Sequence, residues 1–343
     1  SDVCSSDLDP IEEGVLVVAG GRIVAVGPKG TAIPQGATIR RLPGRVLMPG
    51  LIDTHSHVGS VAAGDPSGPI QPEVRVLDAF DVREASVRRA QAGGITTANV
   101  MPGSGHLVSG QTLYIKLRDG NKIEDLLITN RAGRVAGGLK MANGTNSRRD
   151  PPFPGTRAKS ASLVREKFVA AQEYLEKIER AKGDPEKMPA RDLGLEILGE
   201  VLRGERIAQH HTHRHDDILT VLRLQQEFGF RVVLHHVSDG WKVAEEIAAA
   251  KVPCSLIVVD SPGGKLEARD VDFKTGAVLE KAGAVVGFHT DDPVTDSRLF
   301  LRSGALAVRA GMTRAGALKG MTLAGARSEE HTSELQSPYV ISY

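Results

Sequence analysis

Between residues 50 and 327 the chain alternates short apolar runs with longer segments in which apolar residues recur every three or four positions. Short runs such as 95–100 (ITTANV) and 231–234 (RVVL) predict buried strands. The apolar stripe across 162–182 predicts an amphipathic helix. Strands that are apolar on both faces and alternate with helices indicate a parallel sheet covered by helices, as an open doubly wound sheet or as a closed barrel.

The same pattern predicts further elements and one long loop. No Gly-rich phosphate-binding motif follows the first strand, which weakens the case for a nucleotide-binding domain. The Pro-, Gly- and Arg-rich stretch 143–157 is a candidate active-site loop. We expect further helices at 81–92, 217–228 and 241–250, and further strands at 254–259 and 284–288.

The pattern divides the chain into four segments. Residues 9–48 contain β-branched runs around a Gly-Gly turn, which predicts a small β-unit ahead of the main domain at 49–327. Residues 1–8 lack an apolar pattern, and 328–343 breaks the preceding helical pattern with mostly polar residues. We expect both of these ends to be foreign to the fold, with the second forming a disordered tail.

Composition narrows the classes of partner. The net charge of +1 and the scattered basic residues argue against nucleic acid. No apolar run is long enough to span a membrane. We therefore expect a small-molecule substrate and neither nucleic acid nor membrane as partner, and we leave a homo-oligomer open. The localisation is unassigned: the cytoplasm is favoured, and the loss of an N-terminal signal peptide is compatible with the sequence.

Histidine and aspartate follow the ends of four apolar segments. Because the carboxyl ends of strands in parallel α/β folds form one active face, we expect these side chains to converge. The four transitions are VLMPGLID into THSH (His55, His57), RIAQ into HHTH (His210, His211, His213), RVVL into His235 and His236, and AVVGF into HTDD (His289, Asp291, Asp292).

The spacing of the first pair favours a metal. His55 and His57 are two residues apart, so on a strand both point to the same face and are able to bind one cation. Ligands that are mostly imidazole nitrogens favour Zn²⁺ or a similar divalent transition metal over Mg²⁺ or Ca²⁺. The sequence therefore predicts a transition-metal site at the strand ends.

Several stretches together resemble one known family. These stretches are PGLIDTHSH, AGGITTANVMPGS, VLRLQQEFGFRVVLHHVSDGWKVAEEIAAAKVPC and HTDDP. In this order they are similar to the metal-dependent amidohydrolase superfamily, in its imidazolonepropionase-like branch, over about residues 11–327. The resemblance implies a (β/α)8 TIM-type barrel at 49–327 and a β-sandwich built from segments before and after it, which we expect to be incomplete here.

The resemblance also implies roles for residues of the site. His211 is favoured over its neighbours His210 and His213 as the ligand from the HHTH stretch. Lys140 is able to form a carbamylated bridge between two ions, so both one and two ions remain open. The implied metal ligands are His55, His57, His211, His236 and Asp291, and the candidate substrate-binding residues are His106, His213 and His289.

The chemistry expected of this site is hydrolysis of an amide-type C–N bond other than an ordinary protein peptide bond. A metal-bound hydroxide would attack the carbonyl, and Asp291 would take its proton and pass it to the leaving nitrogen. Cyclic amides, N-acyl compounds and dipeptide-like compounds all remain open as substrates. The alternative functions are a non-catalytic barrel scaffold and a metal-binding protein related to amidohydrolases.

Overall fold

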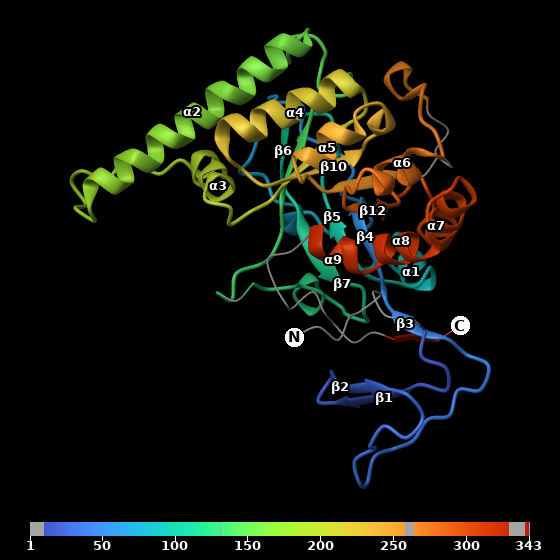
Figure 1. Ribbon diagram of the computed structural model, residues 1–343. Coiled ribbons are helices and arrows are strands. Elements are labelled where there is room, and N and C mark those ends of the chain that lie inside the picture. Colours follow the sequence, from blue (N-terminus) through green and yellow to red (C-terminus); the bar gives the residue numbers. More distant parts are fainter. Residues whose placement is uncertain (1–9, 131, 258–263, 329–339, 343) are drawn as a thin grey trace.

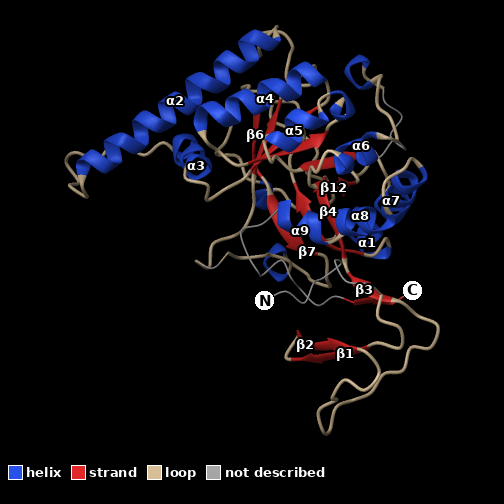
Figure 2. Cartoon of the chain, in the orientation of Figure 1, coloured by secondary structure: helices blue, strands red, loops and turns tan. Residues whose placement is uncertain are grey.

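The computed structural model describes residues 10–130, 132–257, 264–328 and 340–342. Strands lie in the middle of the main domain and helices lie around them (Figures 1 and 2). The strands of this domain are β4 (Leu51–Ser56), β5 (Ile95–Val100), β6 (Val108–Gln111), β7 (Leu113–Lys116), β8 (Leu139–Ala142), β9 (Ala208–Thr212), β10 (Val232–His236), β11 (Cys254–Ile257) and β12 (Val286–His289).

Hydrogen bonds join these strands into two sheets. One has the order β12-β11-β10-β9-β8-β6, in which β8 to β12 are parallel, and the other has the order β4-β5-β7, in which β4 and β5 are parallel. Strand β12 lies beside β4, where the amide of Asp291 donates to the carbonyl of His55 at 2.9 Å. The coarse α/β prediction is therefore confirmed, while closure of the strands into one barrel stays a prediction.

Strands β6 and β7 run antiparallel to their neighbours in the two sheets. They occupy a position where the predicted barrel would have a parallel strand. The reason is the connection between β5 and β6, which spans only 101–107 and contains no helix. A parallel return needs a crossover of a dozen or more residues, so a segment this short brings the chain back in the opposite direction.

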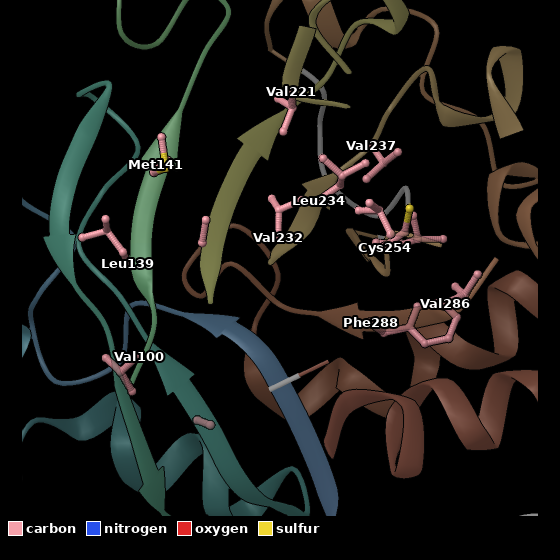
Figure 3. Packing of buried hydrophobic residues seen from close by; sticks show 14 of the residues in the cluster. Val100, Leu139, Met141, Val221, Val232, Leu234, Val237, Cys254, Val286 and Phe288 are labelled. Atoms are coloured by element: carbon pink, nitrogen blue, oxygen red, sulfur yellow. The ribbon is translucent and has the colours of Figure 1, made fainter. Parts of the chain in front are cut away.

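The parallel strands present different side chains on their two faces. Figure 3 shows Met141, Leu234, Cys254 and Val286 among the buried apolar side chains, and strand register places them on one face of β8, β10, β11 and β12. The residues that alternate with them form a polar face that includes Lys140, His211, His235, Ser255 and His289. Buried polar side chains on one face of a strand set are the first structural sign of a functional site.

The helices agree with the predicted pattern, with shifted ends. The helix predicted at 81–92 begins four residues later, because the Glu84 side chain accepts a hydrogen bond from the Ser86 amide and caps the helix there. The 241–250 prediction is split into a 3₁₀ turn at Gly240–Lys242 and a helix from Ala244. The helices are α1 (Ala85–Ala92), α2 (Arg157–Ala181), α3 (Leu193–Leu202), α4 (His215–Phe228), α5 (Ala244–Ala249), α6 (Thr275–Lys281), α7 (Phe300–Arg309), α8 (Arg314–Met321) and α9 (Leu323–Ser328).

The N-terminal unit is a β-hairpin that stands apart from the main domain (Figure 1). Strands β1 (Val15–Ala19) and β2 (Arg22–Gly27) are joined by Gly20 and Gly21, which have φ values of 56° and 72° that glycine adopts without strain. Strand β3 (Leu47–Pro49) pairs instead with β13 (Val340–Ser342). The β-sandwich therefore stays a prediction.

The two segments predicted to be foreign are described only in part. The segment 1–8 lies outside the described residues. Within 328–343, the structure describes the end of α9 and strand β13. In the described part of the chain, no helix is both long enough and apolar enough to cross a bilayer.

Candidate metal centre

Except for His210, which is in register with Met141 and Leu234 on the apolar face, the histidines predicted from the strand ends converge on one face of the strands. Within each of three groups, every residue offers a ligand atom, and these atoms lie within 4.8 Å of one another. Residues from β4, β9, β10 and β12, or directly after them, meet here. The groups are His55, His57 and Asp291; His55, His236 and His289; and His211, His213 and His236.

The contact between His57 and Asp291 requires a positive charge. The carbonyl of Met101 only accepts hydrogen bonds and lies 2.6 Å from His57 Nδ1, so this nitrogen carries a proton. In a neutral imidazole the other nitrogen, Nε2, then offers a lone pair, and it lies 2.9 Å from Asp291 Oδ1. Two acceptors at this distance repel each other unless a proton or a metal ion lies between or beside them.

Lys140 lies against the first strand of the site and has no exposed surface. Its Nζ lies 3.0 Å from His55 Nε2 and donates to Met101 Sδ at 3.1 Å. Burial lowers the pKa of Lys140 to about 7, partly offset by the charge of Asp291. A large share of this amine is therefore neutral near pH 7.

Two consecutive histidines reach the same site from β10. Along a regular strand His235 and His236 would point to opposite faces. Instead, their ring centroids lie 5.0 Å and 4.9 Å from that of His55. His236 has a φ of 71°, a left-handed conformation that ends the strand and redirects its side chain. Strained backbone of this kind is often found at functional sites.

The donor atoms around His211 fit a metal ion. Both ring nitrogens of His211 and Nε2 of His213 and of His236 are buried and have no hydrogen-bond partner among the described residues. Burial, followed by neighbouring charges, lowers the pKa of His211 and of His236 well below the ordinary value, so both rings are neutral. Buried polar atoms without partners are rare, and a bound cation would satisfy their lone pairs.

Asp291 is ionised and its loop is anchored on both sides. Burial alone would raise the pKa of Asp291, but the hydrogen bond and charge of His57 bring it below the ordinary value. Its φ of 53° is left-handed. On one side Thr290 donates to Asp53, and on the other Ser297 donates to Asp292 through its amide at 3.0 Å. These bonds hold the strained residue in place.

Other histidines have separate contacts. His106 is buried outside the three groups, where its Nε2 donates to the carbonyl of Asp65 at 2.6 Å and its ring packs beside Phe153. His215 is half exposed, and its Nδ1 lies 3.2 Å from Asp239. His289 contacts His236 and belongs to the central group.

Sequence reasoning missed the hydroxyl groups that support the histidines. Ser238 lies 2.7 Å from His213 Nδ1, and Ser255 lies 2.7 Å from His289 Nδ1. Thr54, between two site residues in the sequence, contacts Ser255. The available signal was a serine inside the apolar run CSLIVV, at the same phase of the strand as the site residues.

Comparison with known proteins places this geometry in a family. No family model matches the chain. The solved structure of an amidohydrolase from Thermotoga maritima MSB8 superimposes with a TM-score of 0.83 and 31% identity, covering 92% of this chain and 83% of that one. This chain belongs to the amidohydrolase superfamily.

Of two curated relatives of this amidohydrolase, the first has a name that agrees with the predicted imidazolonepropionase-like branch. An imidazolonepropionase from Paracoccus denitrificans (strain Pd 1222) is 26% identical over 351 aligned positions, covering 93% of this chain and 83% of the relative. Amidohydrolase tasK from Hapsidospora irregularis is 25% identical over 345 positions, covering 91% of this chain. The chain spans only 35% of the length of tasK.

The buried lysine yields a prediction about stability and pH. The folded pKa of Lys140 is about 7 and the unfolded value is about 10.4, so between these values only the unfolded chain holds the proton. The stability of the wild type should therefore rise with pH across this window. In metal-free, bicarbonate-free protein, Lys140→Met should raise the urea midpoint most at pH 6, and the gain should shrink towards pH 10.

The control for this measurement is Lys281→Met, in which an exposed lysine of α6 is replaced. The urea midpoint of this variant should differ little from that of the wild type, and the difference should stay constant with pH. If the difference in urea midpoint between Lys140→Met and the wild type were equally constant with pH, the buried amine would not have the lowered pKa.

Proposed function

We propose that this protein is a metal-dependent hydrolase that cleaves an amide-type C–N bond in a small molecule. The observation that carries the proposal is the convergence of candidate ligand atoms in three groups, within each of which the atoms lie within 4.8 Å of one another. The unpaired nitrogens of His211 and His236 in the same site add further lone pairs for a metal ion. Membership of the amidohydrolase superfamily agrees with this chemistry.

The residues proposed to hold the metal are five of the seven residues in the three groups. We assign His55, His57, His211, His236 and Asp291 as ligands of Zn²⁺ or a similar divalent transition metal. When bound, such an ion lowers the pKa of a water molecule to about 7 and polarises a carbonyl group.

The chain's own contribution is centred on Asp291. Its lowered pKa keeps the carboxylate ionised near neutral pH, so it is able to accept a proton from the attacking water. The same group then returns the proton to the leaving nitrogen of the substrate. The left-handed backbone of Asp291, held through its neighbours Thr290 and Asp292, keeps the carboxylate at the metal edge.

The proposed substrate class is a cyclic amide, an N-acyl compound or a dipeptide-like compound. His213 and His289 belong to the three groups but are proposed to contact substrate, as is His106 from the loop after β5. The imidazolonepropionase relative makes a cyclic amide the first compound to test.

The choice of ligands within the HHTH stretch and its surroundings predicts different effects for two histidines. His211→Ala should abolish hydrolysis and reduce the zinc bound per chain, because it removes a buried ligand. His215→Gln should change neither, because His215 contacts Asp239 outside the groups. Zinc retained after dialysis is measured by atomic emission. Loss of zinc only in the His215 variant would contradict the assignment.

The role of Asp291 predicts a separation of binding from turnover. Asp291→Asn keeps the shape of the side chain but cannot take up the proton, so turnover should fall by about 100-fold or more. Most of the zinc should remain, because the four histidines are intact. Turnover is measured with the best substrate from a panel of cyclic amides, N-acyl amino acids and dipeptides. Near-normal turnover would remove Asp291 from the proton transfer.

Lys140 decides between one and two ions. Its neutral amine is the form that reacts with carbon dioxide, and the resulting carbamate would bridge two cations beside His55. Metal-free protein reconstituted with zinc and bicarbonate should then bind two ions per chain, falling to one without bicarbonate or in Lys140→Ala. One ion under every condition would leave the lysine outside the metal site.

A further inference from the structure

A chain of hydrogen bonds runs behind the metal ligands. It joins Thr54 on β4, Ser255 on β11, His289 on β12 and His236 on β10. Thr54, Ser255 and His289 are fully buried, and His236 is 3% exposed. The distances are 2.7 Å from Ser255 Oγ to His289 Nδ1 and 3.2 Å from His289 Nε2 to His236 Nδ1. The four residues lie on four different strands, so it is the tertiary fold that brings them into contact.

The direction of every bond follows from the first one. Thr54 Oγ1 lies 3.0 Å from the carbonyl of Phe288, which only accepts, so the single hydroxyl proton of Thr54 is donated there. The contact between Thr54 and Ser255 must then use the proton of Ser255. Ser255 has no second proton, so it accepts from His289 Nδ1.

The same argument determines which ring nitrogen carries the proton in His289 and in His236. A neutral His289 with its proton on Nδ1 has a lone pair on Nε2, and this lone pair accepts from His236 Nδ1. His236 therefore carries its proton on Nδ1 and leaves Nε2 bare. This is the His236 nitrogen that is buried without a hydrogen-bond partner among the described residues.

We infer that Thr54 and Ser255 are positioning residues that fix the tautomers of His289 and His236, so that Nε2 of His236 is the atom offered to the metal. The inference rests on the proposed function, in which His236 is a metal ligand. Neither hydroxyl touches the metal or the substrate. Each acts by excluding the reverse chain, in which protons on both Nε2 atoms would block the bare nitrogen.

The hydroxyl of Thr54 is the group that excludes the reverse direction of the hydrogen-bond chain. Without this hydroxyl, the proton of Ser255 is free to point at His289 Nδ1. His289 then takes its proton on Nε2 and donates to His236, which shifts the proton of His236 to Nε2. Partners of this kind, behind a ligand histidine, typically change metal affinity by about 10- to 100-fold.

The test uses two substitutions at the same position. Thr54→Val keeps the shape and removes the hydroxyl, and it should weaken zinc binding by about 10-fold. Thr54→Ser keeps the hydroxyl and loses only the methyl group, and it should bind zinc within about 3-fold of the wild type. Ser255→Ala should match Thr54→Val. Affinity is measured by competition with a chromophoric chelator, after circular dichroism has shown that each variant is folded.

A matched control separates the relay from the loss of any buried hydroxyl. Ser109 on β6 is also buried, and its hydroxyl has no partner among the described residues. Ser109→Ala should leave zinc affinity unchanged. Equal affinity in the wild type, Thr54→Val and Ser255→Ala would overturn the inference, and so would an equal loss in Ser109→Ala.

A second measurement is made on metal-free protein and does not depend on zinc binding. Long-range ¹H–¹⁵N spectra of metal-free protein labelled at histidine report which ring nitrogen is protonated, with signals assigned from single His→Gln variants. We expect Nδ1–H for both His236 and His289, and Nε2–H in Thr54→Val. An Nε2–H tautomer of His236 in the wild type would overturn the relay. A correct tautomer in a wild type that binds no zinc would instead contradict the proposed function alone.

Discussion

The site depends on one electrostatic constraint, which is the burial of many neutral imidazoles around a single ionised carboxylate. Burial lowers the pKa of His211 and of His236, so these rings present lone pairs and not charges. Asp291 is the negative group to which His55 and His57 both turn Nε2, at 3.3 Å and 2.9 Å. Such an arrangement is costly without a cation and becomes favourable with one.

The fold meets this constraint by placing the proposed ligands at strand ends and by departing from regular strand geometry at two of them. His236 and Asp291 both adopt left-handed backbone, which allows His235 and His236 to reach the site together and turns the Asp291 carboxylate towards His57. Hydrogen bonds stabilise these departures from regular strand geometry. The hydroxyls of Thr54 and Ser255 bond behind the rings and orient them. The proposed metal ligands and the hydroxyl groups that support them therefore form one unit.

Much of this arrangement could be predicted from the sequence, because its signals are local. The spacing of His55 and His57, and the histidines that follow RVVL and AVVGF, are readable from strand periodicity. The prediction that these side chains converge also follows, because parallel strands end at a common edge. The ligand roles of His211 and Lys140 rest on family resemblance and stay predictions.

The remaining features could not be read from the sequence, because they depend on tertiary contacts. The positive φ of His236 carries no sequence signature, since left-handed backbone is usual for glycine and not for histidine. The antiparallel course of β6 and β7 depends on how a short loop returns the chain. The contact of Thr54 with Ser255 joins positions 201 residues apart.

Anomalous diffraction from crystals soaked in zinc, recorded above and below the zinc absorption edge, tests the central claim most directly. The account predicts a strong peak bound by His57 and Asp291, in contact with the buried histidines of the other strands. Zinc found only at a pair outside the three groups, such as His215 and Asp239, with the histidines around Asp291 bonded to each other and to water, would contradict it.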